Sequence, residues 1–310
     1  MESMNIRPKI SCIVCTYNRQ DFILQCLEAL THQSLDAKLY EVIVVDNHSN
    51  DATAKLVKDF IANHTDVQMT YVFEGKQGLS HARNAGAGVS QSNILTYIDD
   101  DAIADSHLLE EVLRVFEQSP LTGCVGGRID LALPPNTPWW YSDRLAGYYS
   151  SFHLPTTSIK KISKVWELPY GANFSVAKRA LFEVGGFSVH LGRKGKDFSG
   201  GEEIDLAYRI AANGYDVYYS PFTKVTHYIR EDRMNLKHMV KSARSGAKLW
   251  VHMERDLMKS NMGIRWDLEN MIKDLIKFSF YFGSHPLKKR FQFYLQALHN
   301  YEKVKSKLSQ

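Results

Sequence analysis

The sequence is poor in cysteine, and this scarcity limits the metal and redox chemistry it can carry. Its 310 residues include four cysteines. Cys12 and Cys15 have the CxxC spacing of many zinc and redox sites, but the sequence has no second CxxC pair. Both lie in an apolar, strand-like run, where residues three apart point to opposite faces. We therefore expect buried free thiols rather than a zinc or redox site.

Long apolar runs are also missing. No stretch reaches the roughly 18 uninterrupted apolar residues of a membrane span, and the short polar segment before residue 10 does not resemble a secretory signal. The hydrophobic fraction of 44% and the charged fraction of 23% are ordinary for a globular protein. We expect a cytoplasmic protein with a sizeable core.

A third absence concerns phosphate binding. Neither GxGxxG nor GxxxxGK[ST] follows the first apolar strand, which argues against NAD enzymes and P-loop nucleoside triphosphatases. If the protein binds a nucleotide, a metal ion would then have to hold the phosphates.

Strand and helix patterns alternate along the first hundred residues, which predicts an α/β fold with a mainly parallel sheet and crossover helices. Beyond residue 120 the pattern is looser, with strands and helices mixed. The expected strands are residues 10–15, 41–45, 69–73, 94–98, 123–133, 165–176 and 216–219. The expected helices are residues 20–33, 49–61, 80–89, 106–118, 178–184 and 202–213.

The charge balance changes sign near residue 235. Residues 1–235 carry 23 Lys and Arg against 28 Asp and Glu, whereas residues 236–310 carry 15 against 6. We therefore predict a domain at 1–235 and a helical, basic extension at 236–310. The extension mixes Lys288, Lys289 and Arg290 with many aromatic residues, which is typical of helices on anionic membranes. Packing on the first domain or oligomerisation would account for its apolar positions equally well.

Asp99, Asp100 and Asp101 directly follow an apolar strand. Ligands of open α/β sheets bind at the carboxyl ends of the strands. Three adjacent carboxylates repel one another unless a cation neutralises them, and Mg²⁺ or Mn²⁺ commonly bridges such groups to substrate phosphates. The alternative is a solvated acidic turn that caps the next helix. Asp46 ends the second strand in the same way and can bind a ribose or base, or it can serve as a local turn residue.

Four motifs in residues 10–100 resemble the nucleotide-binding half of inverting family 2 glycosyltransferases, which have a GT-A-type fold. They are Cys15-Thr-Tyr-Asn-Arg19, Val45-Asp-Asn-His-Ser49, Gly78-Leu-Ser-His-Ala-Arg-Asn-Ala-Gly86 and Tyr97-Ile-Asp-Asp-Asp101. The resemblance divides the first domain into a nucleotide-binding half (1–120) and an acceptor half (121–235).

The same resemblance implies roles for these residues. Thr16, Asp46 and Arg83 would hold the uracil and ribose of a UDP-sugar, Asp99 would contact the ribose, and Asp101 would bind the metal. The nucleotide-binding group would also include Tyr17, Asn18, Arg19 and Asp100.

The second half of the domain also resembles the family. Gly171-Ala-Asn173 is similar to the segment lining the donor sugar, and Gly200-Gly-Glu-Glu-Ile-Asp205 looks like the motif that supplies the catalytic base. The usual Glu-Asp is replaced by Glu202-Glu203, so Glu203 would be the base, with Glu202 and Asp205 near the sugars. An acidic first helical turn, favoured by the helix dipole, is the alternative.

Three further residues carry expectations with open alternatives. Some relatives use a histidine at the position of His227 as a metal or diphosphate ligand, although a surface histidine would fit as well. Trp139 and Trp140 could stack on an acceptor sugar or belong to a core.

The resemblance implies a glycosyltransferase that uses a UDP-sugar, a hydroxyl acceptor on a glycan or lipid-linked saccharide, and Mn²⁺ or Mg²⁺. The reaction would be a single displacement with inversion, serving polysaccharide biosynthesis at the inner face of the cytoplasmic membrane. No nucleic-acid partner is expected. A nucleotidyltransferase and a non-catalytic nucleotide-sugar-binding protein are the alternatives.

Overall fold

A computed structural model describes residues 7–194, 200–258, 264–280 and 287–308 of the chain. Its contacts divide the chain into two compact units. We call the first, Met1–Ala132, Ser151–Lys196 and Glu202–Tyr228, the sheet unit. The second, Leu133–Ser150, Asp197–Gly201 and Ile229–Gln310, is the helical unit. The domain boundary expected at residue 235 stays a prediction.

Within the described residues, nine strands form one mixed sheet in the order β3-β2-β1-β4-β8-β6-β9-β5, with β7 paired to β9. The β1–β2, β1–β4, β2–β3 and β6–β9 pairs are parallel, while β8 and β5 are antiparallel to their neighbours. The strands are β1 (Ile10–Thr16), β2 (Tyr40–Asp46), β3 (Gln68–Phe73), β4 (Ile94–Asp99), β5 (Ala102–Ala104), β6 (Thr122–Ala132), β7 (Lys160–Lys161), β8 (Asn173–Ala177) and β9 (Asp216–Tyr228). The expected mixed, mainly parallel α/β sheet is confirmed.

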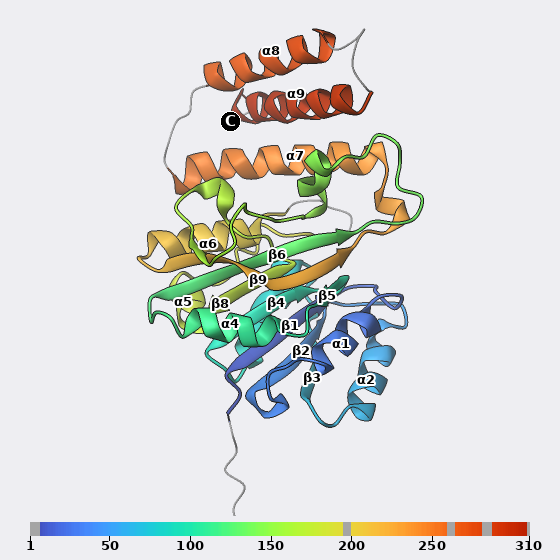
Figure 1. The fold of residues 1–310 in the computed structure, drawn as a ribbon, viewed down its shortest axis with the longest axis vertical. Helices are drawn as coiled ribbons and strands as arrows, with labels where there is room; N and C mark the ends of the chain where they lie inside the picture. Colours follow the sequence, from blue (N-terminus) through green and yellow to red (C-terminus); the bar gives the residue numbers. More distant parts are fainter. Residues whose placement is uncertain (1–6, 195–199, 259–263, 281–286, 309–310) are drawn as a thin grey trace, which may run out of the picture. The chain divides into compact units, whose positions relative to one another are not determined.

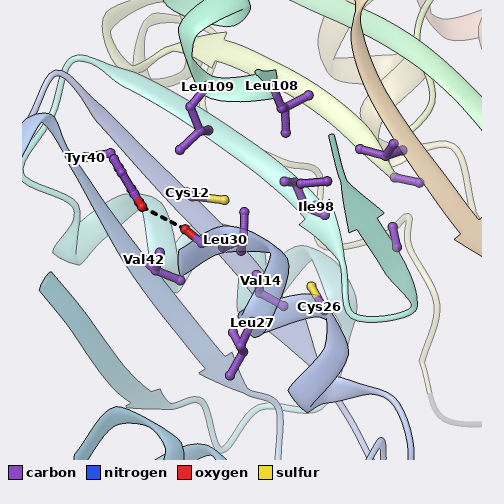
Figure 2. Close-up of a cluster of buried hydrophobic side chains, with 14 of the residues drawn as sticks. Cys12, Val14, Cys26, Leu27, Leu30, Tyr40, Val42, Ile98, Leu108 and Leu109 are labelled. Atoms are coloured by element: carbon purple, nitrogen blue, oxygen red, sulfur yellow. Dashed lines mark hydrogen bonds between the residues drawn. The ribbon is translucent and has the colours of Figure 1, made fainter. Parts of the chain in front are cut away.

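Helices flank this sheet and cover its apolar strands. They are α1 (Ile23–Thr31), α2 (Thr53–Asn63), α3 (Leu79–Val89), α4 (Leu108–Phe116), α5 (Lys178–Glu183) and α6 (Glu202–Ala212). Alternate residues of β1 and β2, such as Cys12, Val14 and Val42, pack against α1 and α4 in one buried cluster (Figure 2). The Tyr40 hydroxyl donates a 2.8 Å hydrogen bond to the Leu30 carbonyl there, which satisfies its polar atom within the core.

The other face of β1 and β2 meets α3 at close range. A Cβ added to Gly86 would lie 2.5 Å from Cγ2 of Ile13 and 3.1 Å from Cγ2 of Val45. Only a glycine lets the helix approach the strands this closely, so Gly86 fixes α3 against the sheet. This packing also holds Arg83, which is on the same helix, in place at the sheet.

Two expected strands differ from the observed ones. The strand expected at 216–219 runs on to Tyr228, although Pro221 lies within it. The register between β6 and β9 shifts from Ser220 to Lys224, and a proline is tolerated at such a bulge. The extended segment expected at 165–176 was wrong in its first part, because Val165–Glu167 forms a 3₁₀ turn and the strand starts at Asn173.

The helical unit contains α7 (Leu236–His252), α8 (Ile264–Phe280) and α9 (Leu287–Leu308). Helix α9 packs against both α7 and α8 (Figure 1). Beside them, the ring of Tyr149 stacks on that of His238 with centroids 5.3 Å apart. Among the residues described, no helix is both long enough and apolar enough to cross a membrane.

Candidate active site at the carboxyl ends of the strands

Polar residues end the three central parallel strands at the same edge of the sheet. Thr16 of β1 pairs in register with Asp46 of β2, and Cys15 pairs with Asp99 of β4. Thr16 and Asp46 are almost fully buried, whereas Asp99 is partly exposed. This is the edge where open α/β sheets bind their ligands.

Asp99, Asp101 and His227 form a cluster at this edge. One ligand atom from each lies within 4.8 Å of the other two. The short strand β5 follows the acidic run and pairs with β9, so that Ala102 lies opposite His227. His227 Nε2 lies 3.0 Å from Asp101 Oδ1, and both side chains are buried. Two carboxylates and an imidazole form a donor set that suits a divalent ion such as Mn²⁺, so the residues fit the expected metal.

Arg19 pairs with the acidic run. Its Nε lies 3.0 Å from Asp100 Oδ1 and its Nη2 lies 3.4 Å from Asp101 Oδ2. Burial raises the pKa of Asp100 to about 6, while Arg19 opposes this shift and the neighbouring Asp101 adds to it. Arg19 thus pairs with two carboxylates of the run, and its expected role in nucleotide binding stays a prediction.

Arg83 joins the acidic run to the expected catalytic motif. This buried side chain places Nη1 2.6 Å from Glu202 Oε1 and 3.8 Å from Glu203 Oε2, and Nη2 3.4 Å from Asp99 Oδ1. The guanidinium of Arg83 packs directly against the backbone of Gly171, because a Cβ on Gly171 would lie 2.3 Å from Arg83 Nη2. One guanidinium therefore connects the strand-end acids with both glutamates at the start of α6.

The two glutamates have different surroundings. Glu202 is buried, and burial together with the charge of Glu203 raises its pKa to about 7 against the opposing effect of Arg83. Glu203 is more accessible, and its Oε1 accepts a 3.2 Å hydrogen bond from the backbone N–H of Gly171. That hydrogen bond holds the Glu203 carboxylate beside the loop that contains Gly171.

The loops after β1 and β2 bind each other through side chains. Asn18, whose φ is +53°, accepts a hydrogen bond from the Asn50 N–H at its Oδ1, and its own N–H donates to the Ser49 hydroxyl. Asp46 accepts 2.8 Å hydrogen bonds from the Ser49 N–H and from the Tyr71 hydroxyl. The first of these is the local turn contact that the sequence left open as an alternative for Asp46.

Sequence reasoning missed Tyr71 and Asn47 as members of this site. Asn47 donates to the carbonyls of Glu74 and Lys76 and accepts from the Gly78 N–H, which fixes the loop that leads into α3. Neither residue stands out by type. Tyr71 could have been found only from the β2–β3 register, which places it opposite Val44, two residues before Asp46.

Other expected site residues make structural contacts. Asn173 donates to the carbonyls of Arg128 and Thr223 at 3.1 and 2.9 Å. Asp205 accepts hydrogen bonds from Arg209, one helical turn further along α6. Tyr17 is partly exposed beside the β1 loop. Their roles in nucleotide or sugar binding stay predictions.

The expected acceptor tryptophans belong to the helical unit. Trp139 is largely exposed, whereas Trp140 is buried and its ring centroid lies 5.4 Å from that of Phe291. The two alternatives that the sequence left open therefore apply to different residues. Trp140 packs in a core, and Trp139 has a surface that could stack on a sugar.

Curated relatives of this chain transfer sugars. A glucosyl-dolichyl phosphate glucuronosyltransferase of Haloferax volcanii is 26% identical over 235 residues, which cover 75% of this chain and 73% of the relative. A validoxylamine A glucosyltransferase of Streptomyces hygroscopicus subsp. limoneus is 25% identical over 234 residues, covering 67% of this chain and 49% of the relative.

Solved structures share the fold. The mannosyltransferase PcManGT from Pyrobaculum calidifontis, in complex with GDP-Man and Mn²⁺, has a TM-score of 0.62 at 19% identity. That match covers 98% of this chain and 74% of the other. S. aureus TarS 1-349 in complex with UDP has a TM-score of 0.56 at 13% identity, covering 97% of this chain and 91% of the other. At these identities the likeness shows the fold, which is of the GT-A type.

A family model decides the class. The model described as glycosyl transferase family 2 matches residues 11–185, more than half of the chain. The matched segment contains the strand-end acids, Arg83 and Gly171, and ends before α6. The chain therefore belongs to glycosyl transferase family 2, and it is a glycosyltransferase.

Proposed function

We propose that this enzyme transfers a sugar from a UDP-sugar to a hydroxyl of a glycan or lipid-linked saccharide, with inversion at the anomeric carbon. One observation carries the proposal. Arg83 contacts Asp99, a member of the cluster of Asp99, Asp101 and His227, and it also contacts both glutamates of α6. The cluster and the expected base, Glu203, therefore belong to one connected site.

Asp99, Asp101 and His227 are the residues that would hold Mn²⁺ or Mg²⁺. When bound, the ion would neutralise the donor diphosphate and stabilise the charge that develops on it as it leaves. The Mn²⁺ in the structure of PcManGT supports this choice of metal. Asp99 can serve the cluster or the ribose, since its partly exposed carboxylate has more than one acceptor position.

Glu203 would act as the general base. Its carboxylate would accept the proton of the acceptor hydroxyl while that oxygen forms a bond to the anomeric carbon. On the opposite face of the sugar, the bond to the diphosphate oxygen breaks and its electron pair stays with the diphosphate. The Gly171 N–H and Arg83 would hold Glu203 in position.

The uridine and the lipid-linked acceptor rest on weaker support. UDP is bound in the TarS structure, but GDP-Man is bound in that of PcManGT. The name of the Haloferax relative includes a dolichyl phosphate sugar, which supports a lipid-linked acceptor. The base specificity is therefore the first property to measure.

A donor panel of UDP- and GDP-sugars with Mn²⁺, read out as release of nucleoside diphosphate, tests the proposal. We expect release with a UDP-sugar and a loss of about 10³-fold or more in Asp101→Ala. Asp59→Ala, an exposed surface change on α2, is the matched control and should retain wild-type release. The anomeric configuration of the product, determined by NMR, tests inversion.

Two results would contradict the proposal. The first is a complete lack of diphosphate release with any donor in the presence of Mn²⁺. The second is wild-type release by Asp101→Ala. Efficient release from GDP-sugars alone would overturn the choice of uridine and leave the roles of Asp101 and Glu203 in place.

A further inference from the structure

Two expectations from the sequence concern charged residues and a partner outside the chain. Membrane contact by Lys288, Lys289 and Arg290 stays a prediction, because the side chains of these three residues lie outside the described ones. Glu202, which was expected near the sugars, is described, and its surroundings point to another role.

Glu202 is enclosed by the protein rather than open to a substrate. Only 2% of its surface is exposed, and its Oε1 lies 2.6 Å from Arg83 Nη1. The other carboxylate oxygen, Oε2, is buried and has no hydrogen-bond partner in the described part of the chain. A Cβ added to Gly192 would lie 3.3 Å from Glu202 Cδ, so the backbone also packs on this carboxylate. A sugar hydroxyl would have to displace protein atoms to reach it.

The backbone at 191–193 is fixed beside Glu202 by contacts with the first turn of α3. The Leu79 N–H donates a 3.0 Å hydrogen bond to the Arg193 carbonyl, and the Ser80 hydroxyl donates a 2.8 Å hydrogen bond to the Leu191 carbonyl. Gly192 lies between these contacts with a φ of +91°, and a Cβ there would lie 2.7 Å from Ser80 Oγ. This part of the wall around Glu202 is therefore built by the sheet unit itself.

Glu202 makes the shortest contact of the Arg83 guanidinium. Nη1 lies 2.6 Å from Glu202 Oε1 but 3.8 Å from Glu203 Oε2, which is too far for a hydrogen bond. Glu203 Oε1 accepts the hydrogen bond from the Gly171 N–H. Among the described residues, no donor occupies Glu203 Oε2, so this oxygen is available to take a proton.

Arg83 needs a negative partner wherever it points. Its guanidinium is buried and stays charged, and a buried charge without a partner is costly. If Glu202 did not supply the negative charge, Nη1 would turn to the next carboxylate, that of Glu203. A direct ion pair between Arg83 and Glu203 would then occupy the oxygen that has to accept the proton of the acceptor.

We propose that Glu202 is a positioning residue that acts through Arg83: it binds the guanidinium and thereby keeps Glu203 Oε2 open for the proton. The two adjacent glutamates thus have different tasks, since one binds the arginine and the other serves as the base. The inference rests on the proposed function, because it presupposes that Glu203 is the general base.

Steady-state kinetics at about pH 8 test this role, since Glu202, with a pKa of about 7, is ionised there. Diphosphate release is measured with Mn²⁺ and the UDP-sugar that the donor panel selects. Glu202→Gln should lower kcat about 30-fold and change KM for the donor by about two-fold or less, because the base rather than donor binding is impaired. Glu202→Asp keeps the negative charge and should recover most of the lost kcat.

A double-mutant cycle shows whether Glu202 acts through Arg83. In an Arg83→Gln background, Glu202→Gln should change kcat by about two-fold or less, because no guanidinium remains to be held. Losses that multiply in the double variant would overturn the proposal, since Glu202 would then act independently of Arg83.

Glu167→Gln is the matched control in the same unit. Glu167 is also buried, with Oε1 2.7 Å from Lys160 Nζ and Oε2 without a hydrogen-bond partner in the described structure. Urea denaturation should show a similar loss of stability in Glu167→Gln and Glu202→Gln, whereas Glu167→Gln should keep the wild-type kcat. An equal loss of kcat in both variants would assign the effect to general damage and contradict the proposal.

A crystal structure of Glu202→Gln gives a readout that needs no turnover. Arg83 Nη1 should lie within about 3.2 Å of Glu203 Oε2, closer than the 3.8 Å of the wild type. An unmoved guanidinium together with a wild-type kcat would overturn the proposal. A wild-type enzyme that releases no diphosphate from any donor would instead contradict the proposed function, and the position of Arg83 in the variant would still show whether Glu202 holds it away from Glu203.

Discussion

Two regions of this molecule bury carboxylates, but they balance the charge differently. At the strand-end site, Asp100 and Asp101 share Arg19, while Asp99, Glu202 and Glu203 share Arg83. Carboxylates outnumber guanidinium groups there. In the helical unit, Asp267 meets two lysines, and Lys307 also pairs with Glu254. Two ammonium groups therefore balance the two carboxylates Asp267 and Glu254.

This difference separates a site built for a cation from a site built for packing. Burying several carboxylates around too few cations is costly, and a divalent ion relieves that cost. The raised pKa values of Asp100 and Glu202 reflect the burial of acids that the arginines do not fully offset. In the cluster of Asp267, Glu254, Lys303 and Lys307 the positive and negative charges balance, so an added cation would bring no gain. The ion pairs of Asp267 with Lys303 and Lys307 hold α8 and α9 together without a ligand.

The largest effect should come from Glu203, the more accessible member of the glutamate pair. Glu203→Gln should lower kcat by about 10²–10⁴-fold, because the amide cannot accept the acceptor proton, while KM for the donor changes little. Initial-rate kinetics of diphosphate release with a saturating acceptor would measure this. Glu203→Asp is the matched control and should retain measurable activity. A wild-type kcat in Glu203→Gln would show that another group removes the proton.

Substitutions in the cluster of Asp267, Glu254, Lys303 and Lys307 should change the stability of the protein rather than its catalysis. Lys303→Met removes one of the two ammonium groups on the fully buried Asp267 and should cost about 3 kcal/mol in the free energy of unfolding. Urea denaturation followed by the fluorescence of Trp250 and Trp266, which lie 5.4 and 5.6 Å from Lys303 Nζ, would report on this region.

The control for that change is Lys305→Met on the same helix, since Lys305 is exposed and should alter stability by about 0.5 kcal/mol or less. Turnover per folded molecule should stay at the wild-type level in both variants. Equal unfolding curves for Lys303→Met and the wild type would mean that Lys307 alone neutralises Asp267.

The sequence predicted those features that depend on local order along the chain. Asp46 and Asp99 follow apolar runs, so their place at strand ends could be derived from the pattern alone. His227 was expected only through the family resemblance, because its approach to Asp101 depends on a bulged β9 pairing with β5. The partners of Arg19 and Arg83 could not be derived, since a sequence pattern does not say which carboxylates a long side chain will reach.

The side of α8 that faces α9 could not be derived from the sequence either. Helical periodicity groups Ile272 with Ile276 and Asp267 with Asp274, but it does not decide which side faces α9. That choice is made by the lysines at 303 and 307, which lie on another helix. Pairing between distant elements, rather than propensity, is the information that a single sequence lacks.

The smallest effect concerns the pH dependence of stability. The pKa of Glu202 is near 7 in the folded protein and near 4.5 in the unfolded chain. Between these values the folded state holds a proton that the unfolded state has lost, so the contribution of Glu202 to stability is fully present below about pH 4.5 and is lost as pH rises toward 7. Glu202→Gln should remove that decline, which amounts to at most about 3 kcal/mol for a pKa difference of about 2.5. Urea denaturation with a chelator, at several pH values between 4.5 and 7.5, would measure the difference.

Asp100 contributes a decline of the same sign up to about pH 6, so the wild type and Glu202→Gln should still share that part. The comparison between the two proteins therefore isolates Glu202. If their pH dependences are identical, Glu202 is ionised throughout this range, and Arg83 outweighs burial at this position. Arg83 would then neutralise Glu202 and Glu203 more fully than the ratio of carboxylates to arginines implies. The difference in charge balance between the strand-end site and the helical unit would in that case rest on Asp99, Asp100 and Asp101 alone.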